Sequence, residues 1–378
     1  MADFYEFFAG GGMARAGLGA DWTCRFANDF NVKKAASYAA NWGSEHLSVG
    51  DVANVSLGDL PGHADLVWAS FPCQDLSLAG ARAGLQGGRS GTFWPFWRLM
   101  QGLRNAGRRP RMIVLENVCG LLTSANGQDF AELAKAITEL DYRFGALVVD
   151  AVHFVPQSRP RLFIVAVAAD AALPEHIVRH DPGSLWHPRN LVEAKFRLPK
   201  AVQDKWVWWN VPAPLARETV FADLIEETPT GTSWHSHAET KALIDMMSLV
   251  NKEKLRAAKR SDRRQIGALY RRTREGVQRA EVRFDDVAGC LRTPGGGSSR
   301  QSILVVEGQR VRSRLLSPRE AARLMGLPDT YVLPEKYNDA YHLMGDGLVV
   351  PVIEHLAQHL LTPIAHAGDA PVETVRAA

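Results

Sequence analysis

Cysteine is scarce in this sequence, and patterns that bind metals are missing from it. The four cysteines are far apart in the 378 residues and form no C-x-x-C pair: Cys24, Cys73, Cys119 and Cys290. His235 and His237 stand close together in WHSH, but no cysteine and no third ligand accompanies them. We therefore exclude a disulfide scaffold and a zinc-finger class, and we expect free thiols and no metal site.

Long apolar runs are also missing. The longest, 147–152 and 162–169, are much shorter than the roughly 20 apolar residues of a membrane-spanning helix. The N-terminal MADFYEFFAGGG has no basic residue ahead of its apolar run, as a secretory signal would. We expect no membrane association and a cytoplasmic location, or a nuclear one in a eukaryote. With 46% hydrophobic and 22% charged residues, the chain has the composition of a globular protein with one large or two modest domains.

Neither sign of charge dominates the whole chain, but positive charge is concentrated in one segment. The net charge of +3 neither requires nor excludes a polyanionic partner. Segment 252–283 contains twelve lysines and arginines but only four acidic residues. A charge run of this kind is usually a solvated face. Its one-sidedness nevertheless favours contact with the phosphates or base edges of DNA.

Strand-like and helix-like segments alternate through the first 170 residues. The strand-like runs 3–9, 24–29, 65–71 and 111–118 are each followed by an amphipathic segment of helical length. This alternation predicts βα units on a parallel sheet. Two further strand-like runs, 146–154 and 161–169, leave no room for a helix between them, which predicts an antiparallel hairpin at the edge of the sheet.

The alternation stops near residue 173, where prolines recur and no helix–strand repeat is visible. We expect a first domain over 1–172, and a second, irregular domain with its return linker over 173–316. The tryptophans of WVWW (206–209) are expected to be core. Ser317, Pro318 and Glu320 form a capping box that predicts a helix start, and 317–363 should complete the first domain. The remainder, 364–378, should be a flexible tail.

A glycine-rich turn follows the first predicted strand, in the sequence FAGGGMARAGL (8–18). Glycines between a strand and a helix allow backbone amides to approach a ligand, although alone they also occur in plain tight turns. Asp29 ends the second strand, where a carboxylate can accept hydrogen bonds from ribose hydroxyls. Asp51 lies near the end of the third and is placed to meet an adenine amino group. Together they favour an adenosine-containing cofactor.

Cys73 follows the buried strand 65–71, in the sequence SFPCQDLSLAG. This position is at the carboxyl edge of the sheet, where open α/β folds bind their ligands. An isolated cysteine is usually a small buried hydrophobe, but nearby helix N-terminal amides could stabilise a thiolate here. The segment 80–91 that follows has five glycines with Arg82 and Arg89, and we expect a lid that closes over DNA.

The sequence resembles the C5-cytosine methyltransferase family. The resemblance rests on PCQ at 72–74, ENV at 116–118, QSRPR at 157–161 and SPREAARLMGLPD at 317–329, in the family's order and spacing. It covers roughly 3–168 and 285–361. It implies an α/β S-adenosylmethionine-dependent (Rossmann-like) methyltransferase fold with a mostly parallel sheet and a smaller, irregular target recognition domain. The implied activity is methylation of carbon 5 of a flipped-out cytosine in a specific double-stranded DNA sequence.

The resemblance also implies roles for individual residues. Cys73 would be the nucleophile that adds to carbon 6, and Glu116 the acid near N3 of the ring. Arg159 would hold the cytosine carbonyl and orient Glu116, and Arg161 would brace the site. The methyl donor, S-adenosylmethionine, would contact the following residues: Phe8, Gly10, Gly12, Asp29, Asp51, Pro72 and Asp346.

The sequence departs from the family pattern at three positions. Met13 and Ser70 stand where glycine is common, and Asp346 stands where the family has an asparagine that supports the cofactor pocket.

The alternatives to this function are a tRNA-cytosine methyltransferase, a catalytically silent DNA-binding regulator and a dinucleotide oxidoreductase. The long arginine-rich region favours DNA over tRNA, and the intact catalytic residues argue against a silent regulator. A glycine turn shared with oxidoreductases does not account for PCQ or ENV. We expect a monomer, either solitary or paired with a restriction endonuclease that acts on the same site.

Overall fold

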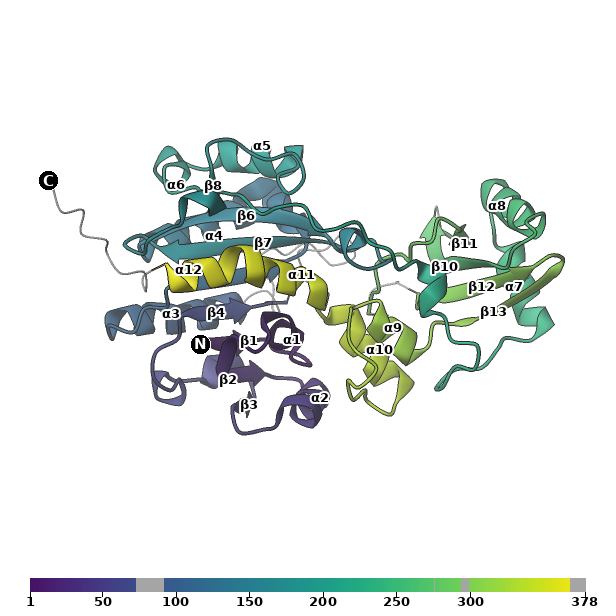
Figure 1. Cartoon of the computed structure of the whole chain (residues 1–378), viewed down its shortest axis with the longest axis horizontal. Helices are drawn as coiled ribbons and strands as arrows, with labels where there is room; N and C mark the ends of the chain where they lie inside the picture. Colours follow the sequence, from purple (N-terminus) through teal and green to yellow (C-terminus); the bar gives the residue numbers. More distant parts are fainter. Residues whose placement is uncertain (73–91, 275, 294–298, 368–378) are drawn as a thin grey trace, which may run out of the picture.

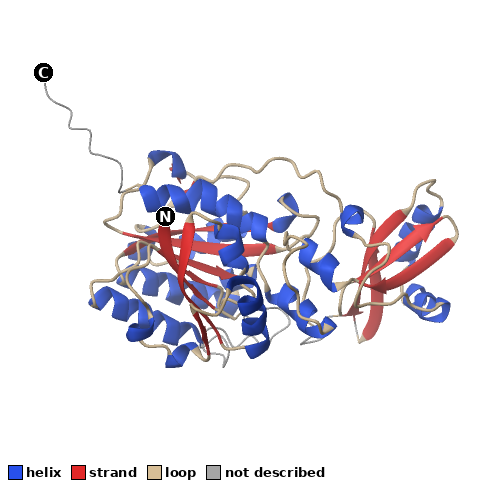
Figure 2. Ribbon diagram, turned by 60° about the horizontal axis from the view of Figure 1, so that its bottom comes forward, coloured by secondary structure: helices blue, strands red, loops and turns tan. Residues whose placement is uncertain are grey.

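The computed structural model describes residues 1–72, 92–274, 276–293 and 299–367. Two sheets lie at opposite ends of the elongated molecule, a large one with helices on both faces and a smaller one at the far end (Figures 1 and 2). The chain crosses from the large sheet to the small one and returns. The molecule therefore has a large and a small domain, as the sequence suggests.

The large sheet has seven strands in the order β3-β2-β1-β4-β5-β7-β6. Its strands are β1 (Ala2–Phe7), β2 (Trp22–Asp29), β3 (Leu47–Val49), β4 (Leu66–Ala69), β5 (Met112–Asn117), β6 (Tyr142–Asp150) and β7 (Pro160–Ala168). All neighbours from β3 to β5 are parallel, whereas β7 runs antiparallel to both β5 and β6. The predicted parallel sheet and its antiparallel edge hairpin are confirmed.

Helices cover both faces of this sheet and explain its continuous apolar strands, because a parallel sheet must be shielded from water on each side. One face carries α1 (Met13–Leu18), α2 (Val32–Trp42), α11 (Val350–Leu356) and α12 (Thr362–His366). The other carries α3 (Phe93–Asn105) and α4 (Gln128–Glu139). α1 and α11 approach so closely at Gly17 that a Cβ there would lie 2.3 Å from Cβ of Ile353.

The segment after β7 packs on the large sheet and not with the small domain. α5 (Arg189–Arg197) and α6 (Lys200–Gln203) contribute to the core that also buries α4. The hairpin of β8 (Val178–Arg179) and β9 (Trp208–Trp209) lies beside β6, and the backbone amide of Phe144 donates to the Lys205 carbonyl. The boundary that the sequence suggests at 173 therefore corresponds to about 212 in the structure. Trp209 is fully buried, in agreement with its interpretation as core.

The small domain is more regular than the sequence suggests. Four antiparallel strands run in the order β11-β10-β12-β13: β10 (Gln265–Arg274), β11 (Val277–Arg283), β12 (Ser302–Glu307) and β13 (Arg310–Leu315). α7 (His237–Asp245) and α8 (Leu249–Lys259) pack on one face through a core that includes Leu255, Leu269 and Leu304. The basic segment forms α8, β10 and β11.

The chain returns through α9 (Pro318–Arg323) and α10 (Tyr337–Asp346), which lie between the two sheets (Figure 1). Ser317 caps α9 in the predicted box with Glu320. A π-helical turn (Ala357–Leu361) joins α11 to α12, so the C-terminal helix extends to His366 and three residues beyond the expected tail boundary. The stretch Tyr337–His366 is apolar enough to span a membrane, but 61% of its most apolar window is buried inside the protein, as in a core helix.

Candidate active site at the carboxyl edge of the large sheet

A cavity of about 580 Å³ opens where the parallel strands of the large sheet end. Most of the site residues suggested by the sequence line it: Phe8, Gly10, Asp29, Asp51, Pro72, Glu116, Arg159, Arg161 and Asp346. Gly12 does not line the cavity but lies behind the residues that do. Cys73 and the expected lid at 80–91 lie outside the described residues. Residues from both ends of the chain thus meet at one edge of the sheet.

The glycine turn after β1 forms one wall of the cavity. Gly10 has φ 57°, its amide donates to Oδ2 of Asp29 at 2.8 Å, and no atom lies within 4 Å of the position a Cβ would take. Gly12 has φ 76°, and a Cβ there would lie 2.4 Å from Nε1 of Trp42. Gly10 therefore leaves open space beside a ligand, whereas Gly12 makes room for the packing of α2.

Asp29 and Asp51 are held by a residue that the sequence interpretation overlooked. Nδ2 of Asn28 donates to the carbonyls of Ser48 and Gly50, each at 3.0 Å, and so ties the end of β2 to the loop after β3. Asn28 is buried and stands directly before Asp29 in the sequence. This position next to a candidate site residue is the one feature of the sequence that could have identified it. The two carboxylates are consequently presented at adjacent strand ends.

Met13, which replaces a common family glycine, is accommodated by a glycine elsewhere. The Met13 side chain is buried, and a Cβ on Gly347 would lie 2.3 Å from its sulfur. The glycine turn and the end of α10 thus fit together because Gly347 leaves room for the Met13 side chain.

The segment that leads into Cys73 is anchored to the neighbouring strand. Nδ2 of Asn117 donates to the Phe71 carbonyl at 3.3 Å, and Nε1 of Trp68 donates to the Ser70 hydroxyl at 3.0 Å. Ser70 also hydrogen-bonds the Glu116 carboxylate. The hydroxyl of Ser70, absent from the glycine that is common here, therefore connects the start of PCQ to ENV.

Glu116 and Arg161 form an ion pair in the cavity wall, with Oε1 and Nε 3.2 Å apart. Burial raises the pKa of Glu116, while the nearby charges of Arg161 and Arg159 oppose that rise. A carboxyl group with this balance can hold or release a proton nearer neutral pH than an exposed glutamate can. It is suited to general acid chemistry.

Arg159 has a different position from the one the sequence suggests. Its guanidinium is buried and donates to the carbonyls of Leu291, Gly345 and Gly347 at 2.9, 2.9 and 2.7 Å. It therefore braces the linker from the small domain against the end of α10, whereas Arg161 pairs with Glu116. The sequence could not show this arrangement, because the carbonyls that Arg159 binds lie more than 120 residues further along the chain.

Two further residues complete this brace. Nη1 of Arg159 also donates to Sγ of Cys290 at 3.3 Å, and although burial opposes it, the charges of Arg159, Arg161 and Arg292 lower the pKa of Cys290. The fully buried Gln157 donates to the Leu324 carbonyl and accepts from the Leu291 amide. Gln157 could be expected to matter because it begins the motif QSRPR, whereas nothing in the sequence pointed to Cys290.

Asp346 is paired with cations and hydroxyls. Its Oδ2 accepts from Nζ of Lys34 at 2.7 Å, and its Oδ1 accepts from the Thr293 hydroxyl. Burial opposes ionisation, but Lys34 and Thr293 lower the pKa of Asp346 overall. The residue therefore carries its negative charge into the cavity wall.

One acidic atom in the cavity lacks a partner among the described residues. Oε2 of the buried Glu6 accepts no hydrogen bond there, and burial raises the pKa of Glu6 to about 8. A cationic or amine group of a ligand would satisfy this atom. The volume, the open glycine turn and the two strand-end carboxylates fit an adenosine-containing ligand that carries an amino acid portion.

Metal chemistry has no support in the described parts of the chain, where no three histidine, cysteine, aspartate or glutamate residues gather at a possible metal site. His235 instead bonds the Ser313 hydroxyl, at 2.9 Å from Nδ1. His235 thus has a structural contact in this domain, whereas His237 is exposed at the start of α7.

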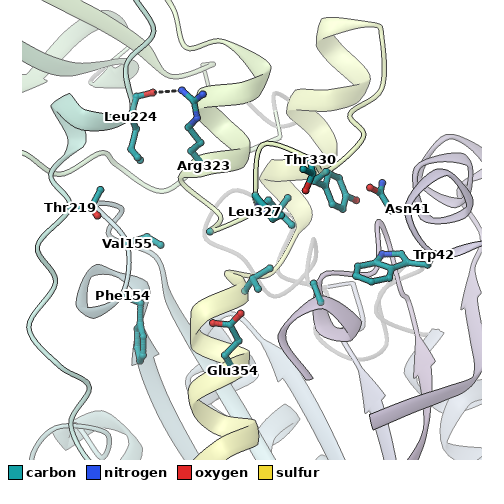
Figure 3. Close-up of a pocket in the computed structure, with 15 residues that line it drawn as sticks. Asn41, Trp42, Phe154, Val155, Thr219, Leu224, Arg323, Leu327, Thr330 and Glu354 are labelled. Carbon is teal, nitrogen blue, oxygen red and sulfur yellow. Dashed lines mark hydrogen bonds between the residues drawn. The ribbon is translucent and has the colours of Figure 1, made fainter. Parts of the chain in front are cut away.

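A second, more open hollow of about 740 Å³ lies on the far side of the glycine turn (Figure 3). Asn41, Trp42, Leu327 and Glu354 line it, and Arg323 is already bonded to the Leu224 carbonyl. Trp42 and Tyr331 both donate to the Gly11 carbonyl, at 3.1 and 2.8 Å, and so buttress the turn from behind. No acid–base pair converges in this hollow among its described lining residues, so the cavity at the sheet edge is the candidate active site.

The fold and this site together define an α/β methyltransferase. A family model for C-5 cytosine-specific DNA methylases matches residues 2–362, and the chain belongs to that family. Its sequence is 25% identical over 362 residues to the type II methyltransferase M.HhaI of Haemophilus parahaemolyticus, covering 94% of this chain and 93% of the relative. It is 24% identical over 373 residues to M.NlaX of Neisseria lactamica, covering 98% and 99%. The protein is thus a DNA cytosine-5-methyltransferase.

Solved structures agree with this fold. The S. pombe Dnmt2 methyltransferase superposes with a TM-score of 0.62 at 16% identity, covering 96% of this chain and 99% of that one. A DNA modification methyltransferase encoded within an E. coli prophage gives a TM-score of 0.57 at 15% identity, covering 98% and 100%. The mostly parallel sheet with a smaller appended domain, expected from the sequence, is confirmed.

Proposed function

We propose that this enzyme transfers a methyl group from S-adenosylmethionine to carbon 5 of a flipped-out cytosine in a specific double-stranded DNA sequence. The observation that carries the proposal is the convergence of the glycine turn, Asp29, Asp51 and the Glu116–Arg161 pair on one cavity that is also lined by Pro72, the residue before Cys73 in the sequence. The cofactor supplies an electrophilic methyl group on its sulfonium. Asp29 would hold the ribose hydroxyls and Asp51 the adenine amino group.

The first step would be addition of the Cys73 thiolate to carbon 6 of cytosine. A bond forms between sulfur and carbon 6, and electron density moves toward N3 and O2 of the ring. In its protonated form, which burial favours, Glu116 would donate its proton to N3. Arg161 would then compensate the charge of the resulting carboxylate, as it does in the ion pair described above. Carbon 5 becomes an enamine-type nucleophile.

The later steps restore the ring. Carbon 5 would accept the methyl group that S-adenosylmethionine, held by the glycine turn, Asp29 and Asp51, would supply, with S-adenosylhomocysteine as the product. A base removes the proton from carbon 5, the sulfur–carbon 6 bond breaks, and Cys73 leaves as a thiolate while N3 returns its proton to Glu116. We assign no residue as that base, and water is a candidate.

Double-stranded DNA would lie between the two domains. In the β10–β11 register Arg272 lies directly opposite Arg279, and like charges at such a position are destabilising unless anions lie nearby. Oε2 of Glu281, 4.0 Å from Nε of Arg272, offsets one of the two charges, and a further anion would offset the other. A phosphate would supply that anion. Of the other arginines in the basic segment, Arg264 is already paired with Glu227, whereas Arg263 and Arg271 are exposed and have no acidic partner among the described residues. The enzyme would act as a cytoplasmic monomer, with or without a restriction endonuclease for the same site.

Replacing Glu116 by glutamine should lower kcat by about 10²- to 10⁴-fold and leave DNA binding nearly unchanged, because the amide keeps the size of the side chain but cannot donate a proton to N3. Single-turnover methyl transfer and a DNA-binding titration measure the two quantities. Glu139→Gln, at an exposed helical position, is the matched control and should behave as the wild type. A kcat for Glu116→Gln within threefold of the control would contradict the acid role.

Genome-wide bisulfite sequencing tests the whole proposal. After expression in a host that lacks cytosine methylation, we expect one short DNA sequence to be methylated at carbon 5 throughout the genome, and this sequence identifies the target. An unmodified genome accompanied by 5-methylcytosine in tRNA would replace the DNA substrate by an RNA one.

A further inference from the structure

Two parallel ion pairs join the first turn of α2 to α10. Nζ of Lys33 lies 2.8 Å from Oδ1 of Asp339, and Nζ of Lys34 lies 2.7 Å from Oδ2 of Asp346. The members of each pair are more than 300 residues apart in sequence, so the sequence interpretation connected neither. Both lysines lie at the positive end of a helix dipole, where a cation is unfavourable unless an acid compensates it.

Only one of these pairs belongs to the active-site cavity. Lys34 and Asp346 both line it, whereas Lys33 and Asp339 do not. The Lys34 side chain is 22% exposed and that of Asp346 37%, compared with 69% for Lys33. The two pairs are otherwise alike in residue type, length and supporting elements. Because of this likeness, the outer pair, Lys33–Asp339, can serve as a control for the inner pair, Lys34–Asp346.

The inner pair replaces the chemistry of an asparagine. An asparagine offers one acceptor oxygen and one donor nitrogen, whereas an aspartate at that position offers acceptors only. Lys34 supplies the missing donor and cancels the added charge. Without it, the Asp346 carboxylate would face a cavity already lined by Glu6, Asp29, Asp51 and Glu116.

We propose that Lys34 is a positioning residue for the methyl donor, and that the Lys34–Asp346 pair forms the wall that an asparagine side chain forms in the resembling family. The pair also fixes the end of α10, because the Thr293 hydroxyl donates to Asp346 and Arg159 bonds the carbonyls on either side of it. Loss of the Lys34 side chain would therefore disturb the part of the cavity wall that faces the methyl donor more than it would disturb the fold. This inference rests on the proposed use of S-adenosylmethionine.

A double-mutant cycle tests the inference with S-adenosylhomocysteine as the probe in isothermal titration calorimetry. Lys34→Met should raise Kd about 10-fold, because it leaves the Asp346 charge uncompensated in the cavity. Asp346→Asn removes the negative charge from the cavity wall but leaves Lys34 without its counter-charge, so Kd should rise less than for Lys34→Met. The double variant Lys34→Met, Asp346→Asn should recover most of the lost affinity. Lys33→Met, in the outer pair, should change Kd less than about twofold.

Kinetics and stability separate positioning from folding. For Lys34→Met we expect KM for S-adenosylmethionine to rise while kcat changes less, with a urea midpoint equal to that of Lys33→Met. Equal Kd values for Lys34→Met and Lys33→Met, or a double variant no better than Lys34→Met, would overturn the inference. Failure of the wild type itself to bind S-adenosylhomocysteine would instead overturn the proposed function, so the two failures are distinguishable.

Discussion

Cys73→Ser should abolish methyl transfer while leaving binding of DNA and of S-adenosylhomocysteine nearly unchanged. A serine hydroxyl is not ionised at neutral pH and is a far weaker nucleophile than a thiolate, so carbon 5 is never activated. The expected loss in kcat is on the order of 10⁴-fold or more. Transfer of a radiolabelled methyl group to duplex DNA measures activity, and electrophoretic mobility shifts measure binding.

Cys119→Ser provides the matched control, because Cys119 is the next cysteine along the chain and follows ENV. Burial raises the pKa of Cys119 to about 11, so it stays a protonated thiol at neutral pH and cannot replace Cys73. We expect Cys119→Ser to retain activity within a fewfold of the wild type. A duplex with 5-fluorocytosine at the target should trap a covalent adduct with the wild type and with Cys119→Ser but not with Cys73→Ser. Turnover by the serine variant would rule out covalent catalysis by Cys73.

The large sheet could be predicted because its signal is local. Strands of a parallel sheet are buried on both faces and appear as short apolar runs, and each is followed by its own helix. The hairpin of β6 and β7 could be predicted for a similar reason, since no helix fits between 154 and 161. Neither prediction requires knowledge of a distant contact.

The domain boundary and the small sheet were harder to predict. The segment 173–211 has little regular structure, yet Trp206 and Trp209 fasten it to β6, and nothing local shows which surface an irregular segment covers. In β11 the arginines alternate with apolar residues, but in β10 they are gathered at the end of the strand, so the segment resembles a charge run more than a pair of strands. The sheet is determined by the pairing of β10 with β12, and β12 begins only at 302, after β11 and a further connection.

The cavity residues likewise divide into those that are positioned locally and those whose role depends on distant contacts. Glycines and carboxylates at strand ends are positioned by the elements that carry them, and the structure brings them together. The partners of Arg159, Lys34 and Asp346 lie hundreds of residues away or in the linker at 289–293, so their roles depend on tertiary contacts. A sequence can nominate an arginine for a site without showing which carbonyl it binds.

Removing the carboxylate of Glu320 should destabilise the protein by about 3 to 5 kcal/mol, because it leaves the Arg314 guanidinium buried without its counter-charge. Arg314 on β13 and Glu320 on α9 are both fully buried and form two hydrogen bonds, at 2.7 and 2.6 Å. Glu320 also accepts the backbone amides of Ser317 and Glu226. This pair therefore joins the small sheet, its incoming linker and the returning helix.

Glu320→Gln keeps the shape of the side chain and isolates the loss of charge, and its free energy of unfolding is measured in urea by tryptophan fluorescence. Glu193→Gln breaks the exposed pair with Arg189 and should cost less than about 1 kcal/mol, since water already solvates both charges. Replacing both partners, as Arg314→Met with Glu320→Leu, should recover only part of the loss, because no unpaired charge remains buried but the amides of Ser317 and Glu226 lose their acceptor. A loss for Glu320→Gln no larger than that for Glu193→Gln would mean that the joint is held by apolar packing around Leu316 and Ala321, with the ion pair contributing little.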